Sequence, residues 1–151
     1  MSGFGDRLRR EARRWFVLAR EDVRAVDACL ASAEPVLGPA AYHLQQAAEK
    51  AIKGLLVTEN VAFGRTHDLL RLGDLASSHY PAWIGHFERL APMSIWNSAY
   101  RYPDAAGMTD GPPDIEELFA ALTEVQDFLK KIEEAFGDLA EWSGLARGGR
   151  D

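Results

Sequence analysis

The chain has 151 residues, a length typical of one domain whose core is large enough to be stable without disulfides or metals. Its 47% hydrophobic and 26% charged residues exclude an intrinsically disordered chain. The single cysteine, Cys29, excludes an internal disulfide, and no Cys/His cluster has the spacing of a structural zinc site. No long apolar run follows the arginine-rich N-terminus, so a secretory signal and a membrane span are not expected. We expect a cytoplasmic protein without a metal or cofactor.

Charge is divided unevenly along the chain, whose formal net charge is −6. Residues 1–24 hold seven arginines against four acidic residues, whereas residues 110–142 hold ten acidic residues against two lysines. Two interpretations remain open for the basic N-terminus. It is the solvated face of an amphipathic helix, or it is a basic patch for an anion or an RNA backbone.

The first two helices are predicted by apolar spacing. In the first segment the apolar residues recur at steps of three and four: Leu8, Ala12, Trp15, Phe16, Ala19, Val23, Val26 and Leu30. This pattern predicts a helix over residues 6–33. Pro35 and Gly38 then interrupt it, and Pro39 suits the beginning of a second helix over residues 39–59.

The middle of the chain is predicted to hold two shorter helices. Thr66 can cap a third helix over residues 67–78. Pro81 can open a fourth that continues to Trp96, and Pro92 should kink or split it near residue 91.

The last ordered segment is predicted to be a fifth helix. Residues 101–113 contain too many prolines and glycines to be anything but a loop. Asp114 can then cap a helix whose apolar residues form a nearly strict heptad pattern: Ile115, Leu118, Leu122, Val125, Leu129, Ile132 and Phe136. We expect this helix to pack lengthwise along a partner, with Leu129 and Phe136 inside the bundle. No strand pattern appears, so we predict an all-α, up-and-down bundle of four to five helices over residues 1–137, with a flexible tail over residues 138–151.

The second helix carries the most informative polar face. His43, Gln46, Lys50 and Lys53 share about 80° of the helix surface at about 100° per residue, so their polar groups can converge on one ligand. The alternative is structural, because Glu49 and Lys53 have the spacing of a helical ion pair.

Three ordered motifs carry a family resemblance. They are the stretch Tyr42-His43-Leu44-Gln45-Gln46-Ala47-Ala48-Glu49-Lys50-Ala51-Ile52-Lys53-Gly54-Leu55-Leu56, then Thr66-His67-Asp68-Leu69, then Tyr100-Arg101-Tyr102-Pro103-Asp104. Together they make the chain resemble the HEPN family, named for higher eukaryotes and prokaryotes nucleotide-binding domains, over roughly residues 10–135. The resemblance implies a five-helix bundle, usually a homodimer, with a cleft between protomers where nucleotide or RNA is handled. It also implies that a minimal nucleotidyltransferase can be the partner, in a toxin-antitoxin-like system.

Many members of that family are ribonucleases that use an arginine followed four to six residues later by a histidine. Here Arg101 would supply the arginine, but residues 102–108 contain no histidine. The group that usually transfers protons near neutral pH is therefore missing, and the catalytic residues stay unassigned. Arg101 keeps a guanidinium suited to phosphate and Tyr102 a ring suited to stacking. Alternatively, Arg101 pairs with Asp104 at a helix end.

His67 and Asp68 are neighbours in sequence and invite a catalytic interpretation. Adjacent helical positions do not face each other, so Asp68 is not expected to orient His67. We favour a helix-capping and dipole role for this pair.

Three functions follow from the sequence. The first is a homodimer that binds nucleotide or RNA through Arg101, Tyr102 and the second-helix residues His43, Gln46, Lys50 and Lys53, supported by His67, Asp68 and Asp104. The second is a metal-independent ribonuclease with a displaced catalytic base. The third is a structural dimerisation module.

Overall fold

The computed structural model describes residues 2–98 and 111–137, and within those two ranges every regular element is a helix. In chain order these are α1 (Ser2–Ala31), α2 (Leu37–Thr58), α3 (Leu69–Ser77), η1 (Pro81–Trp83), α4 (Ile84–Leu90), η2 (Ala91–Asn97) and α5 (Ile115–Phe136), where η marks a 3-10 helix. The prediction of an all-α bundle is confirmed. The predicted loop residues 101–110 and the predicted tail 138–151 lie outside the described residues.

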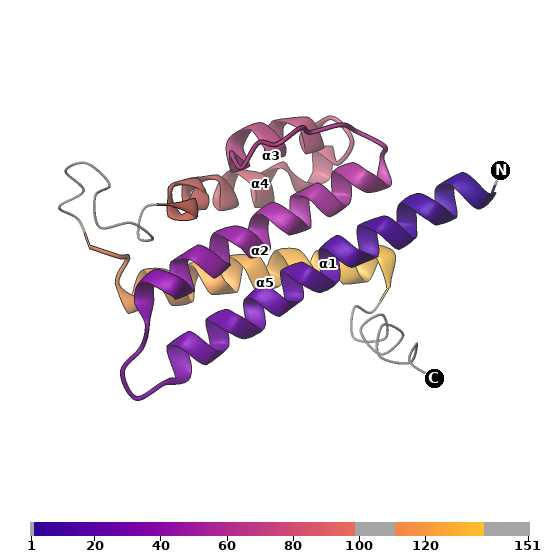
Figure 1. Ribbon diagram of the computed structural model, residues 1–151. Coiled ribbons are helices and arrows are strands. Elements are labelled where there is room, and N and C mark those ends of the chain that lie inside the picture. Colours follow the sequence, from indigo (N-terminus) through magenta and orange to yellow (C-terminus); the bar gives the residue numbers. More distant parts are fainter. Residues whose placement is uncertain (1, 99–110, 138–151) are drawn as a thin grey trace, which may run out of the picture.

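Helix α2 is the centre of the bundle. It forms an antiparallel hairpin with α1, and it also contacts α3, η2 and α5 (Figure 1). The α1–α2 contact is close because one side of α2 is built from fully buried alanines: Ala40, Ala41, Ala47, Ala48 and Ala51. Gly54 continues that side, and a Cβ atom there would overlap with the ring of Phe16. The small residues therefore determine how closely α1 approaches α2.

The third helix begins two residues later than predicted, and its cap is a different residue. The Asp68 carboxylate accepts a hydrogen bond from the Leu70 amide at 3.0 Å, so Asp68 is the N-cap of α3. The Thr66 hydroxyl instead accepts from the Asp68 amide at 3.2 Å, within the preceding turn. The capping role expected of Asp68 is confirmed, and the prediction that Thr66 is the cap was wrong. A carboxylate at this position also interacts favourably with the helix dipole.

The predicted fourth helix is split where Pro92 required it. Helix α4 ends at Leu90, and the chain continues as the 3-10 helix η2 from Ala91. A proline cannot donate the backbone hydrogen bond that an α-helix needs, and its ring crowds the preceding turn.

Helix α5 has the expected cap and the expected buried side. Asp114 and Glu117 form a reciprocal capping box, in which each side chain accepts from the other residue's backbone amide. The central residues of the heptad pattern, Leu129 among them, are buried. Phe136 is only partly buried, because α5 ends there, and its ring packs on Phe16 at a centroid distance of 5.8 Å. Its placement fully inside the bundle was wrong.

No helix in the described part of the chain is both long enough and apolar enough to cross a membrane.

Candidate functional site

Four polar residues are buried where α1, α2 and the α2–α3 turn meet. They are Asp22, Gln45, Glu49 and Lys53. The sequence pattern placed Glu49 and Lys53 on the solvated side of α2, yet the structure leaves only 4% of Glu49 and 6% of Lys53 exposed. Burying a charged group is costly unless it is paired and hydrogen-bonded. The interactions of these four residues therefore define the polar centre of the molecule.

Asp22 is the centre of the first cluster. One carboxylate oxygen lies 2.8 Å from His43 Nδ1, and the other accepts a hydrogen bond from Lys50 Nζ at 2.6 Å. Asp22 is only 7% exposed, whereas His43 and Lys50 are partly exposed and reach the surface. A buried carboxylate on α1 thus fixes two side chains at one edge of α2.

Glu49 is the centre of the second cluster. Its Oε1 atom lies 2.8 Å from His67 Nδ1 and accepts from Gln45 Nε2 at 3.2 Å, and its Oε2 atom accepts from Lys53 Nζ at 3.4 Å. The His67 side chain is 58% exposed, although the carboxylate that holds it is buried. His67 therefore pairs with Glu49 and not with its neighbour Asp68, which caps α3.

Lys53 also packs against aromatic rings. Its Nζ atom lies 5.9 Å from the ring centroid of Trp15 and 5.3 Å from that of Phe63, distances at which a cation is attracted to an aromatic face. The carboxylate of Glu49 and these two rings are the partners of the Lys53 ammonium group. Lys53 lies too deep to contact a ligand directly, which corrects our expectation.

Gln46 connects the Glu49 cluster to η2. Its Nε2 atom donates to Gln45 Oε1 at 2.7 Å and to Asn97 Oδ1 at 3.2 Å. Asn97 is the last residue of η2 and comes just before the segment 99–110, so Arg101, Tyr102 and Asp104 lie outside the described residues. The described network therefore reaches within four residues of Arg101.

The four α2 side chains that we expected to converge on one ligand have separate partners within the chain. His43 and Lys50 meet at Asp22, whereas Gln46 bridges to η2 and Lys53 joins Glu49. Each lysine has its own carboxylate, so with neutral histidines the charges in each cluster cancel. Neither cluster alone is a strong attractor for phosphate.

The histidine–carboxylate pairs have a chemical consequence. When Nδ1–H of a neutral imidazole donates to a carboxylate, Nε2 is left as the hydrogen-bond acceptor, and the ring is held in one orientation. A buried carboxylate behind an exposed imidazole is an arrangement suited to a general base. Among the residues that the structure describes, no group of three His, Cys, Asp or Glu side chains is placed to hold a metal ion.

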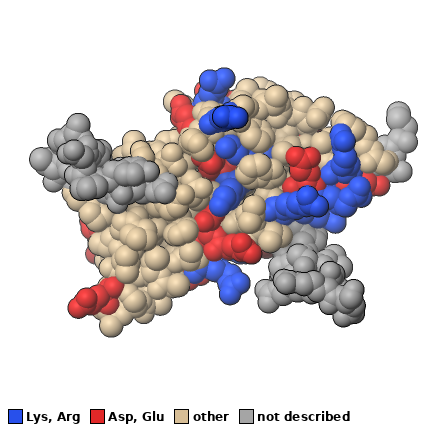
Figure 2. Space-filling view, viewed as in Figure 1, with Lys and Arg blue, Asp and Glu red and all other residues tan. Residues whose placement is uncertain are grey.

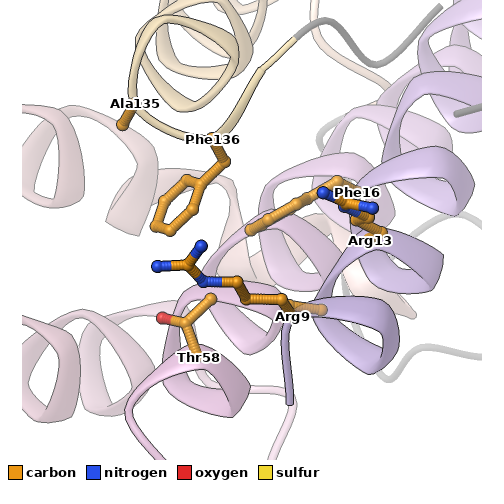
Figure 3. Close-up of a pocket in the computed structure, with 7 residues that line it drawn as sticks. Arg9, Arg13, Phe16, Thr58, Ala135 and Phe136 are labelled. Atoms are coloured by element: carbon orange, nitrogen blue, oxygen red, sulfur yellow. The ribbon is translucent and has the colours of Figure 1, made fainter. Parts of the chain in front are cut away.

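A separate pocket lies where α2 and α5 end. It has a volume of about 140 Å³ and is lined by Arg9, Ala12, Arg13, Phe16, Thr58, Ala135 and Phe136. Arg9 points into the space between Thr58 and Phe136 (Figure 3). Thr58 and Phe136 are the last residues of their helices, whose C-terminal carbonyls carry partial negative charge. The guanidinium groups of Arg9 and Arg13 therefore lie near the partial negative charge of two helix ends, which offsets part of their attraction for an anion.

Sequence reasoning did not identify Asp22 as a site residue. A signal was present, because Asp22 follows Ala19 by three residues and precedes Val26 by four, which places it beside the apolar stripe of α1. An acid at such a position requires a cationic or hydrogen-bonding partner from another element. The sequence did not indicate which one.

Comparison with known proteins gave one finding. The family model described as HEPN domain matches residues 10–137, which is most of the chain. The curated proteins and the solved structures gave no match. With the match covering all of α2 to α5 and most of α1, the chain belongs to the HEPN domain family.

Proposed function

We propose that the protein binds a phosphate-bearing ligand, a nucleotide or RNA, at the edge of α2 where His43, Gln46 and Lys50 reach the surface. Membership of the HEPN family supports a role related to nucleotides or RNA. Arg101 and Tyr102 complete the proposed site, with the guanidinium gripping phosphate and the phenol ring stacking on a base. His67 and Asp68 support this site because they shape the α2–α3 turn. Asp104 belongs to the same sequence motif as Arg101 and Tyr102, and we assign it a supporting role.

The observation that carries this proposal is the hydrogen bond between Gln46 and Asn97 at 3.2 Å. Arg101 follows Asn97 by four residues, and four residues span at most about 14 Å. The covalent chain alone therefore keeps Arg101 within reach of the edge of α2 that carries Gln46.

Charge predicts a ranking among the basic residues of the site. Lys50 is neutralised by Asp22 at 2.6 Å, so it adds little long-range attraction, and we propose that Arg101 supplies most of the positive charge that attracts phosphate. Arg101→Ala should thus weaken binding more than Lys50→Gln.

Fluorescence anisotropy with a labelled nucleotide and a labelled single-stranded RNA tests the ranking. A matched control is Arg71→Ala, an exposed arginine on α3. If Arg101→Ala bound as tightly as the Arg71→Ala control, the proposed site would be wrong.

A second candidate function is metal-independent RNA cleavage, and the His67–Glu49 pair favours it. His67 Nε2 would take the proton of a ribose 2′-hydroxyl, whose oxygen attacks the adjacent phosphorus. The bond to the 5′-oxygen breaks, that oxygen takes a proton from a general acid, and a 2′,3′-cyclic phosphate remains. Arg101 would stabilise the charge on the phosphate oxygens.

Incubation of RNA with the protein in the presence of a chelator tests this candidate. If the protein is a ribonuclease of this kind, the parent forms cyclic-phosphate products, and neither His67→Ala nor Arg101→Ala forms them. His79→Ala is the matched control, because His79 is also a partly exposed histidine near a glutamate, at 3.7 Å from Glu59, but lies at the far end of α3. Products that persist in His67→Ala would exclude His67 as the base.

We also propose that the protein is a homodimer in the cytoplasm. Trp83 and Phe87 are buried in the chain's own core, so these large aromatic side chains are not available for contact with a second subunit. The support comes from large apolar side chains that the described structure leaves exposed, such as Ile95 on η2 and Phe119 on α5. Light scattering at tens of micromolar protein measures the mass of the protein in solution. A monomeric mass would exclude a cleft shared by two subunits.

The family resemblance suggests a minimal nucleotidyltransferase as the partner, in a toxin-antitoxin-like system. Co-purification with the product of a neighbouring gene would test that partner. A chain that serves only as a dimerisation module would dimerise but bind neither RNA nor nucleotide.

A further inference from the structure

We propose that the outer face of α1 is a second binding surface, which takes the phosphodiester backbone of single-stranded RNA. The surface consists of Arg7, Arg10 and Arg14 with the ring of Phe4, and we call it the arginine stripe. The inference deepens the proposed function and rests on it, because it identifies the extended ligand as RNA rather than a free nucleotide.

The stripe is a consequence of helical geometry. At about 100° per residue, Arg7, Arg10 and Arg14 fall within about 60° of the helix surface. That surface is opposite the side of α1 that buries Ala12 and Phe16, and all three arginines are exposed. The rise of the helix separates Arg7 from Arg14 by about 10 Å. Three guanidinium groups therefore line one side of the helix.

The arginines of the stripe outnumber the acidic residues on the same helical turns, Asp6 and Glu11, by three to two. No ion pair joins any of the three to an acidic residue within the described part of the chain, whereas Arg20 pairs with Glu133 on α5. Basic side chains gather over the N-terminal part of α1, whose first turns project beyond the end of α2 (Figures 1 and 2). The stripe thus presents positive charge on a part of the molecule that is open to a long ligand.

Phe4 adds an exposed aromatic ring to the arginine stripe, which is unusual for a helix face that only contacts solvent. Its ring is 53% exposed, and the Arg7 guanidinium carbon lies 5.3 Å from the ring centroid. An exposed ring beside guanidinium groups offers both base stacking and phosphate contacts. Arginine also matches phosphate geometry better than lysine does, because its planar fork donates two hydrogen bonds.

Arg9 and Arg13 do not belong to the stripe. They line the pocket formed by the C-terminal ends of α2 and α5, where the helix dipoles disfavour a phosphate. The chain therefore uses its N-terminal arginines for two purposes, on two sides of one helix.

The position of the stripe predicts a dependence on RNA length. Arg14 precedes Asp22 by eight residues and Arg7 precedes it by fifteen, which correspond to about 12 and 22 Å along α1. A strand advances about 3.4 Å per nucleotide when stacked. A ligand at the Asp22 cluster must therefore be about four to seven nucleotides long to reach the stripe, and a mononucleotide cannot reach it.

The experiment compares Arg10→Gln/Arg14→Gln with a matched control, Arg71→Gln/Lys130→Gln, which removes two exposed charges from α3 and α5. Binding of a single-stranded RNA of about twelve nucleotides and of a mononucleotide is measured over a range of salt concentrations. Each phosphate contact on a single strand contributes about 0.7 to the slope of log K against log salt concentration. We expect the stripe variant to lower the slope for the RNA by about 1.4 and to leave mononucleotide binding unchanged.

The possible outcomes separate this inference from the proposed function. An unchanged slope in the stripe variant, or an equal decrease in the control, overturns the arginine stripe. So does a stripe variant that binds RNA normally but changes the oligomeric state, because the stripe would then be a protein contact. If Arg101→Ala leaves the binding of RNA and of mononucleotide unchanged while the stripe variant lowers the slope, the stripe is supported and the proposed α2 site fails.

Discussion

Replacing Glu49 with glutamine is the sharpest perturbation of the buried network. The substitution keeps the shape of the side chain but removes the charge that faces Lys53 Nζ at 3.4 Å and His67 Nδ1 at 2.8 Å. Lys53 is 6% exposed, so its ammonium cannot regain full hydration. The variant leaves a buried cation without its counter-charge. Removing one partner of a buried ion pair in this way costs more free energy of unfolding than replacing both partners with apolar residues.

The expected magnitude follows from this burial. Removing one partner of a buried pair costs about 3–5 kcal/mol. The rings of Trp15 and Phe63 remain near Lys53 and offset part of that cost, since a partly desolvated cation–ring contact is worth about 0.5–2 kcal/mol. The net loss should be about 2–4 kcal/mol, or about 4–16 °C in melting temperature for a chain of this size.

Thermal unfolding monitored by circular dichroism measures the loss. The matched variant is Glu49→Gln/Lys53→Met, which removes both charges and should recover most of the stability, because an apolar replacement of a buried pair is often neutral. A Glu49→Gln variant that melts within one or two degrees of the parent would show that Lys53 is not confined as the structure describes. Equal losses in the single and double variants would show that the two residues are not coupled.

Two further predictions concern stability. Leu129→Ala should cost about 2–5 kcal/mol in chemical denaturation, and Phe136→Ala should cost less, because Phe136 is partly exposed at the end of α5; the reverse order would contradict the packing of that helix. Burial raises the pKa of Tyr80 from 10.0 to about 12, so the folded state holds this proton more tightly than the unfolded state and should lose the corresponding stability as pH rises from 10 to about 12. Tyr80→Phe should show a smaller decline over that interval, and an identical decline would mean that burial does not raise the pKa of the Tyr80 phenol.

The parts of the fold that the sequence predicted correctly depend on local chemistry. Pro92 interrupts a helix because of its own ring, and Asp114 caps one because of its own carboxylate. The three- and four-residue spacing of apolar residues likewise identified the buried sides of α1 and α5. These effects act over a few residues, so one segment contains the information needed to infer them.

The contacts that the sequence did not predict join residues far apart in the chain. Asp22 meets His43 and Lys50 only because the alanine side of α2 lets α1 pack closely against it. Glu49 and Lys53 looked like a surface ion pair, yet both are buried: Trp15 and Phe63 lie against Lys53, and His67 and Gln45 lie against Glu49. Nothing near these positions in the sequence specifies which segment covers them.

The most direct test of the proposed function follows binding and product formation together in one sample of labelled single-stranded RNA, with the parent protein and with Arg101→Ala. Binding requires only a positive charge close to the phosphate. Rapid cleavage also requires a group that transfers protons near the phosphate, and residues 102–108 contain no histidine for this purpose. The proposal predicts that the parent binds the RNA, that binding weakens as salt rises, that Arg101→Ala binds more weakly, and that product accumulates slowly or not at all. Efficient metal-independent cleavage that Arg101→Ala abolishes would contradict it and establish the ribonuclease, and a parent protein that binds no RNA or nucleotide would leave only the dimerisation module.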